Sequence, residues 1–304
     1  MTLPTNELST ACPFESRYAN VNGLRMHYVE AGTGEPAVLL LHGIPTHAYL
    51  WRNVIPHVSP VARTIALDLV GFGKTDKPTD IDYDLPTYAA FLRAAIEALG
   101  IKRVVLVAMD LGLIVALHYA MHHEAAVAGL AMFEGLFLPV DDALRFQPLP
   151  AQLTMKLFGL RRFAERALVH SGTKPVDRMM SLGTIRRLSQ QELEQYRAPL
   201  NDEAVRRKVW LEGIGPHTLR RTSRQPGDLT DLISQSSAWL RTSPIPKLLL
   251  YAEPGMAVTT RTVRYARENI AHLSTKCVGR GKHFLPEDEP AALGRAVADF
   301  RRGL

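Results

Sequence analysis

Short apolar runs alternate with amphipathic stretches along most of this chain. The runs are of strand length and consist almost entirely of apolar residues, which is typical of strands buried on both faces. They lie at residues 37–41, 64–67, 104–108, 127–133 and 247–252, and a further strand is predicted at residues 272–278. Residues with helical spacing lie between and after them, at 50–57, 88–99, 111–122, 259–269 and 290–302. This alternation predicts an α/β fold with a mainly parallel central sheet and helices on both faces.

Two regions depart from the alternation. Near the start, segments 18–21 and 24–30 flank Asn22-Gly23, a pair that favours a tight β-hairpin. From residue 138 to residue 238 the chain is helical in pattern and rich in arginine, with no strand-like run. We therefore expect a flexible tail at residues 1–13 and a core made of residues 14–137 and 239–304. Residues 138–238 would then form an inserted helical cap.

The composition is that of an ordinary globular protein, with 46% hydrophobic and 22% charged residues. The sequence contains no run of about 18 apolar residues, so no membrane span is predicted. The N-terminus lacks the basic and apolar pattern of a secretory signal. The two cysteines, Cys12 and Cys277, do not suggest a disulfide framework, and no Cys/His cluster suggests a metal. We expect a cytoplasmic protein without a cofactor.

The net charge of +6 is concentrated in the segment between Arg161 and Arg224. This excess indicates a solvated helical surface, or a field that steers an anionic substrate. Nucleic-acid binding is not expected, because aromatic residues do not alternate with the charges. The expected partner is a small apolar molecule, and the chain is expected to be a monomer or a homodimer.

One motif marks a nucleophile. The strand 104–108 leads through Met109 into Asp110-Leu111-Gly112. Small residues therefore lie two positions before Asp110 (Ala108) and two positions after it (Gly112). This is the pattern of a nucleophile elbow, a sharp strand-to-helix turn that exposes its central side chain. Ala108 stands where a glycine is usual. The alternative is that Asp110 merely caps the following helix.

Two further segments supply partners for Asp110. His42-Gly43-Ile44-Pro45 follows a buried strand, where the backbone N–H groups of Ile44 and Leu111 would converge as an oxyanion hole. His42 is expected to brace this loop. His283 lies in a glycine-rich loop after the last strand, as expected of a catalytic base.

Two carboxylates compete to orient His283, since Glu134 and Glu253 both stand at strand ends. The chain order Asp110, Glu134, His283 is that of the α/β-hydrolase fold, in which the acid lies between the nucleophile and the histidine. Glu134 is preferred as the acid that orients His283, and Glu253 remains the alternative.

Several segments closely resemble haloalkane dehalogenases, from about Tyr18 to the end of the chain. The segments are His42–Thr46, Tyr49–Asn53, Asp68–Pro78, Tyr196–Leu200, Pro246–Leu248, Ala252–Gly255 and His283–Asp288. The resemblance implies an α/β-hydrolase fold with Asp110 as nucleophile, Glu134 as acid and His283 as base. It also implies a covalent alkyl ester on Asp110 as the intermediate.

The chain departs from this family at two positions. Halide-binding members usually have asparagine where this chain has Ile44 and tryptophan where it has Leu111, and neither replacement offers a side-chain N–H. The related epoxide hydrolases use two cap tyrosines to protonate the ring oxygen. This cap has only Tyr196, whose match to the family's cap motif suggests a structural role, with His170 or His217 as other possible donors.

We therefore expect hydrolysis of an epoxide, a lactone or a related small apolar electrophile. One alternative is a haloalkane dehalogenase whose halide donors come from Trp51, Trp210, Trp239 or Asn53. Another is recruitment to a cofactor-free, non-hydrolytic reaction such as an oxygenase or a cyclase, and a further one is a binding protein with an idle triad. Apolar residues of the cap that are candidates for lining the pocket are Leu138, Phe146, Leu157, Phe163 and Leu182.

Overall fold

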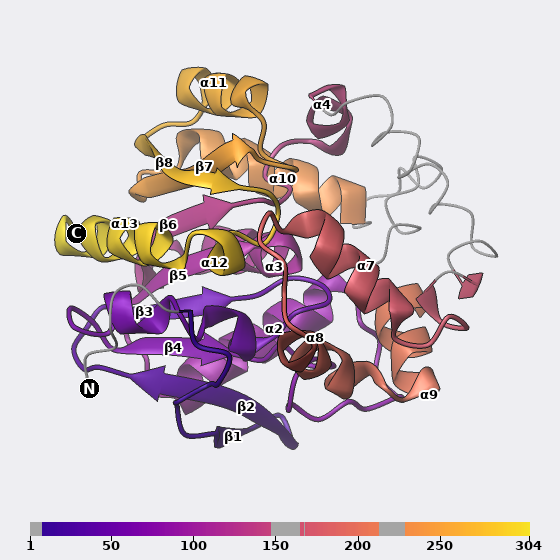
Figure 1. Cartoon of the computed structure of the whole chain (residues 1–304). Coiled ribbons are helices and arrows are strands. Elements are labelled where there is room, and N and C mark those ends of the chain that lie inside the picture. Colours follow the sequence, from indigo (N-terminus) through magenta and orange to yellow (C-terminus); the bar gives the residue numbers. More distant parts are fainter. Residues whose placement is uncertain (1–7, 147–164, 167, 213–228) are drawn as a thin grey trace.

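The structure, a computed structural model, describes residues 8–146, 165–166, 168–212 and 229–304. Within these residues an eight-stranded sheet forms the centre of the molecule (Figure 1). In spatial order its strands are β1 (Arg17–Val21), β2 (Leu24–Ala31), β4 (Thr64–Leu67), β3 (Ala37–Leu41), β5 (Val104–Met109), β6 (Val127–Phe133), β7 (Lys247–Pro254) and β8 (Leu273–Gly281). The pairs β1–β2 and β2–β4 are antiparallel, and all later pairs are parallel.

Helices cover both faces of the sheet, which confirms the predicted fold class. In Figure 1, α12 and α13 lie in front of the strands, and α2, α3 and α10 lie behind them. The helices of the core are α1 (Ile55–Val58), α2 (Leu85–Ala98), α3 (Asp110–His122), α11 (Thr260–Asn269), α12 (Leu285–Asp288) and α13 (Pro290–Arg302), with the short turns η1 (Ala48–Trp51) and η2 (Glu124–Ala126). Every residue of β3, β5 and β6 is buried, as expected for strands covered on both faces.

Local sequence signals explain the ends of these elements. Asn22 and Gly23 both have positive φ angles, so the predicted hairpin between β1 and β2 is confirmed. The continuous helix predicted over residues 50–57 is wrong. The chain instead forms η1 and then α1, which has Pro56 in its first turn, the helical position that a residue without an N–H tolerates.

The segment after β6 is helical, and a cap region is present. Its described elements are α4 (Val140–Arg145), α7 (Lys174–Gly183), α8 (Gln190–Arg197), η3 (Ala198–Leu200), α9 (Glu203–Arg206), η4 (Arg207–Glu212) and α10 (Leu229–Thr242). The expected cap boundary at residue 239 falls inside α10, which packs against α3 of the core. The exact division between cap and core therefore stays a prediction.

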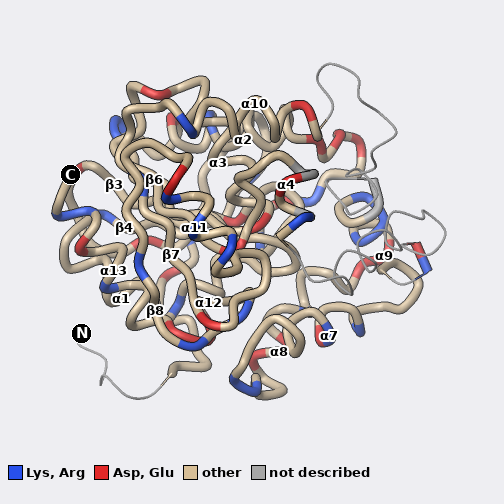
Figure 2. The backbone as a smooth tube through the Cα atoms, turned by 90° about the horizontal axis from the view of Figure 1, so that it is seen from above, with Lys and Arg blue, Asp and Glu red and all other residues tan. Residues whose placement is uncertain are grey.

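Several described arginines of the cap are paired with carboxylates or buried against backbone carbonyls. Arg197 pairs with Asp177 at 2.6 Å, and Arg207 pairs with Glu165. The buried guanidinium of Arg206 donates to the carbonyls of Val169, Leu200 and Asn201. Figure 2 shows acidic and basic residues interspersed over the described backbone. This pairing favours the interpretation of the basic segment as an ordinary solvated surface.

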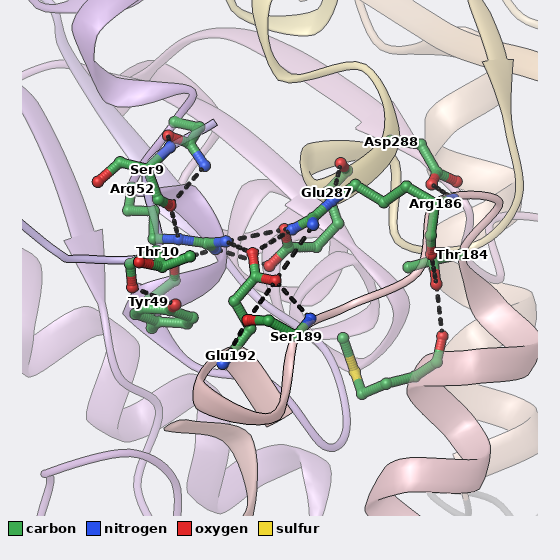
Figure 3. A network of polar contacts seen from close by, with 12 residues as sticks. Ser9, Thr10, Tyr49, Arg52, Thr184, Arg186, Ser189, Glu192, Glu287 and Asp288 are labelled. Atoms are coloured by element: carbon green, nitrogen blue, oxygen red, sulfur yellow. Dashed lines mark hydrogen bonds and ion pairs between the residues drawn. The ribbon is translucent and has the colours of Figure 1, made fainter. Parts of the chain in front are cut away.

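A buried cluster of charges joins the cap to the core (Figure 3). We call it the clamp; its members are Arg52, Arg186, Glu192, Tyr196 and Glu287. The Arg52 guanidinium, fully buried, donates to both oxygens of Glu287 at 2.6 and 3.1 Å and to Glu192 at 2.8 Å. Arg186 also donates to both carboxylates, and the Tyr196 hydroxyl donates to Glu287. Two guanidinium groups thus balance two buried carboxylates, with Arg186 at the partly exposed edge of the cluster.

The clamp also fastens the start of the described chain. The Ser9 N–H donates to Asn53 Oδ1 at 3.0 Å, and the Ser9 carbonyl accepts from Arg52 Nε at 2.7 Å. The Tyr49 hydroxyl donates to the Thr10 carbonyl at 2.6 Å. Residues 1–7 lie outside the described residues, so a flexible tail stays a prediction for them.

No helix in the described part of the chain is both long and apolar enough to cross a membrane.

Removing the charge of Arg52 should destabilise the fold strongly. Arg52→Met leaves Glu192 and Glu287 with Arg186 as their only clamp cation, and breaking a buried ion pair from one side costs about 3–5 kcal/mol. Chemical denaturation of the variant measures this loss. Arg93→Met is the matched control, because Arg93 pairs with Glu97 on an exposed helix face and should cost less than about 1 kcal/mol. Equal losses in the two variants would contradict the importance of the clamp.

Candidate active site

Asp110 stands at a sharp turn between β5 and α3. Its φ angle is +48°, a left-handed conformation that is rare for residues other than glycine and is found at strained functional turns. The turn is possible because its neighbours are small: a Cβ on Gly112 would lie 2.4 Å from the His42 carbonyl oxygen. The Asp110 N–H donates to the Glu134 carbonyl at 3.1 Å. A third of the Asp110 side chain is left exposed (33%), although the strand leading to it is buried.

The loop after β3 comes close to this carboxylate. A Cβ on Gly43 would lie 2.5 Å from Asp110 Oδ1, so only glycine leaves room there. The Ile44 N–H donates to Asp110 Oδ1 at 2.9 Å, and the Leu111 N–H also hydrogen-bonds the carboxylate. The two amides named as an oxyanion hole from the sequence therefore converge on Asp110.

His42 braces this loop, as expected. Its Nε2 accepts from the Leu69 N–H at 3.0 Å, and its Nδ1 lies 3.0 Å from the Gly43 carbonyl, to which it donates. Burial lowers the pKa of His42 to about 4, so the ring is neutral at pH 7. A neutral ring with both nitrogens engaged has no free position for proton transfer.

His283 lies between two carboxylates. Its Nε2 is 3.5 Å from Asp110 Oδ2, and its Nδ1 is 3.4 Å from Glu134 Oε2. Burial alone would lower the pKa of His283, but its contacts with Asp110 and Glu134 outweigh burial and raise the pKa to about 10. Burial works in the opposite sense on Asp110, whose pKa is nevertheless held below its ordinary value by His283 and by the Ile44 and Leu111 amides. The resting pair is thus an imidazolium beside a carboxylate.

Glu134 is the carboxylate that the structure brings to His283. It is fully buried at the end of β6 and accepts from the N–H groups of Met256, Ala257 and Val258 at 3.1, 2.6 and 3.3 Å. Glu253 is exposed and lies in a surface hollow beside Arg280 and Thr259. Geometry therefore favours Glu134 over Glu253 as the partner of the histidine.

Two of the four side-chain donors named from the sequence are already engaged in the described structure. Ile44 and Leu111 offer only hydrocarbon beyond their backbones. Asn53 is held by Ser9, and Trp239 Nε1 donates to Glu124 at 2.7 Å. The indole N–H groups of Trp51 and Trp210 are buried and have no hydrogen-bond partner among the described residues. Of the four donors named from the sequence, these two are available.

Other cap residues fall in different places. Tyr196 is buried in the clamp, which confirms a structural role, and His170 is half exposed between Glu165 and Glu203. Leu138 is buried, whereas the ring of Phe146 packs on Tyr265. Leu182, a candidate for lining the pocket, is 57% exposed and is therefore not part of the apolar core of the cap. Leu157, Phe163 and His217 lie outside the described residues.

The clamp was not predicted from the sequence. Arg52 and Glu287 stood within segments that resemble a known family, but no local pattern pairs residues so far apart in the chain. The amides of residues 256–258 were also missed, because backbone donors carry no side-chain signal. Among the described residues, no group of three or more His, Cys, Asp or Glu side chains could hold a metal ion.

Comparison with known proteins places the chain in a class and in a family. Residues 36–290 match the family described as the alpha/beta hydrolase fold, in agreement with the sheet and the elbow. The chain therefore belongs to the α/β hydrolases. Its full-length similarity to curated relatives goes further: the chain belongs to the haloalkane dehalogenase family and is a hydrolase.

The similarity extends over nearly the whole chain. It is 34% identical to a haloalkane dehalogenase of Mesorhizobium japonicum, over 90% of this chain and 87% of the relative. It is also 34% identical to one of Sphingobium indicum, over 97% and 98%. Among solved structures, a loop variant of haloalkane dehalogenase DbeA from Bradyrhizobium elkanii has a TM-score of 0.86 at 33% identity, covering 95% of this chain and 97% of the other. Haloalkane dehalogenase DatA from Agrobacterium tumefaciens has a TM-score of 0.82 at 27% identity, covering 95% and 96%.

Neutralising Asp110 should lower the pKa of His283. In Asp110→Asn the negative charge beside Nε2 is lost while the shape is kept, so the imidazolium is stabilised less and its pKa falls from about 10 toward its ordinary value near 6.5. A titration of the His283 ring by NMR measures this pKa. Asp299→Asn, which changes an exposed carboxylate paired with Arg302, should leave it unchanged. A His283 pKa that is the same in Asp110→Asn and wild type would contradict the electrostatic link.

Proposed function

We propose that this chain hydrolyses haloalkanes in two steps, through an alkyl ester of Asp110. The observation that carries the proposal is that the two oxygens of the Asp110 carboxylate have different contacts. Oδ1 accepts a hydrogen bond from the Ile44 N–H at 2.9 Å, while Oδ2 faces the His283 ring at 3.5 Å. One oxygen is thus placed to become an ester carbonyl, and the other is left to attack. The names of the relatives support carbon–halogen bonds as the target.

In the first step, Asp110 Oδ2 attacks the alkyl carbon and displaces the halide. The carboxylate is ionised without the help of a base, because its pKa lies below its ordinary value. The electron pair of the carbon–halogen bond leaves with the halide, and Asp110 becomes a neutral ester. His283 takes no part in this bond exchange.

In the second step, His283 activates a water molecule. Esterification removes the negative charge that raises the pKa of His283, so the ring releases its proton to solvent and becomes a base. The water attacks the ester carbonyl carbon, and the Ile44 and Leu111 amides stabilise the oxyanion that forms on Oδ1. Glu134 holds the Nδ1–H of the ring and stabilises the new imidazolium. His283 keeps the proton taken from the water, the alkyl oxygen leaves with the proton of the newly added hydroxyl as the alcohol, and the Asp110 carboxylate is restored.

The departing halide needs donors other than the side chains of residues 44 and 111. Trp51 and Trp210 are candidates, since their N–H groups are unpaired among the described residues. With few donors, the best substrates are those whose leaving group is a weak base and is poorly hydrated. We therefore expect iodoalkanes and bromoalkanes to react faster than chloroalkanes. The cap, residues 138–238, is proposed to set the choice of the alkyl group.

A second candidate function is the opening of an epoxide or a β-lactone. The hydrocarbon side chains of Ile44 and Leu111 favour it, because in a strained ring the leaving oxygen stays attached to the alkyl group and no free halide must be bound. The attack by Asp110 and the water step are the same. The electron pair of the broken ring bond stays on the ring oxygen, as a carboxylate from a β-lactone or as an alkoxide from an epoxide, which takes a proton from solvent. A non-hydrolytic reaction would instead survive in Asp110→Asn, which separates it from both hydrolytic candidates.

Removing the base should trap the ester. His283→Ala incubated with 1-iodobutane, 1-bromobutane, 1,2-epoxybutane or β-butyrolactone should gain the mass of the alkyl or ring-opened group on the peptide that contains Asp110. Intact-protein and peptide mass spectrometry measure the adduct. His283→Ala combined with Asp110→Asn is the control and should gain nothing. An adduct with haloalkanes supports dehalogenation, and an adduct with the cyclic substrates alone supports ring opening. The absence of an adduct with all four compounds would contradict both proposed functions.

Restoring the side-chain donors should accelerate dehalogenation. Ile44→Asn combined with Leu111→Trp adds two N–H groups beside the site, and a hydrogen bond to a charged group contributes about 1.5–3 kcal/mol. Each productive donor should raise the rate of bromide release from 1-bromobutane by about tenfold to a hundredfold. Ile44→Leu with Leu111→Phe, which adds bulk without donors, is the control. An unchanged bromide rate in the donor variant would count against halide as the leaving group.

A further inference from the structure

The backbone on both sides of His283 is tied to the cap. After His283, the Phe284 N–H donates to the Gly183 carbonyl at 2.9 Å. Before His283, the Lys282 N–H donates to Asp288 Oδ2 at 3.0 Å. The other oxygen of Asp288 accepts from cap amides, those of Ile185 and Arg186, at 2.8 and 3.1 Å. The loop that holds the imidazole is therefore bracketed by hydrogen bonds that lead to the segment at the end of α7.

This cap segment is itself held down by the clamp. Arg186 Nε donates to the Glu287 carbonyl at 2.7 Å, and its Nη2 reaches the carboxylates of Glu192 and Glu287. Glu287 is fully buried under Arg52. Figure 3 shows Asp288 and Thr184 beside Arg186, at the edge of the same network of charges. The base loop, the cap segment and the core thus meet at one buried junction.

The side chains and backbone at this junction are tightly packed. A Cβ on Gly183 would lie 2.6 Å from the Phe284 ring and 3.4 Å from His283 Cβ. The Phe284 ring also stands edge-on to the His283 imidazole, with 4.8 Å between the ring centroids. Displacement of the cap segment would therefore push directly on the base.

We propose that Asp288 and the cap segment Gly183–Arg186 form a latch that positions His283 for the water step. This inference rests on the proposed function, in which His283 is the base that frees the ester. Asp288 and Gly183 are positioning residues, because they act on the ring through its backbone and through Phe284.

The latch predicts a defect in one step alone. His283 spans 3.5 Å to Asp110 and 3.4 Å to Glu134, so a small shift of its loop weakens both contacts at once. Attack by Asp110 on the alkyl carbon does not need the imidazole, whereas water attack on the ester does. A misplacement of about 1 Å can cost about a hundredfold in rate. Loosening the latch should therefore slow ester hydrolysis and spare ester formation.

Asp288→Asn tests the latch with a change of a single atom. An amide side chain has only one acceptor oxygen, so it cannot accept from Lys282 and from the Ile185–Arg186 amides together. In rapid-quench reactions with 1-iodobutane, ester hydrolysis should slow by at least about tenfold, while the rate of ester formation stays within about twofold. The butyl adduct on Asp110 should then accumulate during turnover. The pKa of His283, measured by NMR without substrate, should fall as the ring moves away from its carboxylates.

Gly183→Ala tests the latch from the cap side. The added methyl group presses on Phe284 without changing any charge, and it should give the same slow hydrolysis, the same adduct and a lowered His283 pKa. The control is Asp299→Asn, which removes an exposed carboxylate paired with Arg302 and should match wild type in every measurement. Thermal denaturation of all variants identifies any that simply unfold.

Two outcomes overturn the proposal. If Asp288→Asn and Gly183→Ala slow both steps equally, or leave hydrolysis and the His283 pKa unchanged, the junction serves stability alone. Failure of the proposed function looks different, because wild type and His283→Ala would then form no adduct with 1-iodobutane. In that case the NMR titration still decides whether the latch holds the imidazole.

Discussion

The chemistry of this protein depends on one constraint, a carboxylate held in a left-handed turn by close contact with backbone. Gly43 and Gly112 allow the loop after β3 to approach Asp110, and a Cβ at either position would clash. That approach aligns the Ile44 amide with Oδ1 and leaves Oδ2 facing His283. The strain of the turn persists because the surrounding sheet over-determines it.

Charge then couples the two steps of the proposed reaction. The carboxylate of Asp110 keeps His283 protonated at rest, and the ester that forms on Asp110 removes that hold. The base is thereby released only once there is an ester to hydrolyse. Glu134, fixed by three backbone N–H groups, keeps a second carboxylate beside the ring throughout. The clamp and the proposed latch join the loop of His283 to the cap, so cap residues also hold the base in the proposed reaction.

Local patterns were sufficient for the fold and for the residues that meet at Asp110. The central strands β3, β5 and β6 are buried on both faces, and their apolar runs, together with the Asn22-Gly23 turn, carry strong signals. The elbow and the loop of Ile44 are also readable, because close backbone approach demands small residues at fixed spacing. The clamp was not predictable, since Arg52 and Glu287 lie 235 positions apart and their pairing depends on the assembled fold. The choice of Glu134 over Glu253 likewise needed coordinates, because both residues lie at strand ends and only the assembled fold shows which of them contacts His283.

The central claim is that water attacks the carboxyl carbon of Asp110 and not the alkyl carbon of the substrate. A single turnover of excess enzyme with 1-iodobutane in H₂¹⁸O tests this most directly. The ester route predicts ¹⁸O in the peptide that contains Asp110 and an unlabelled butanol, because the alcohol takes its oxygen from the carboxylate. Label in the butanol with none in the peptide would mean direct attack by water, and would contradict the assignment of Asp110 as nucleophile.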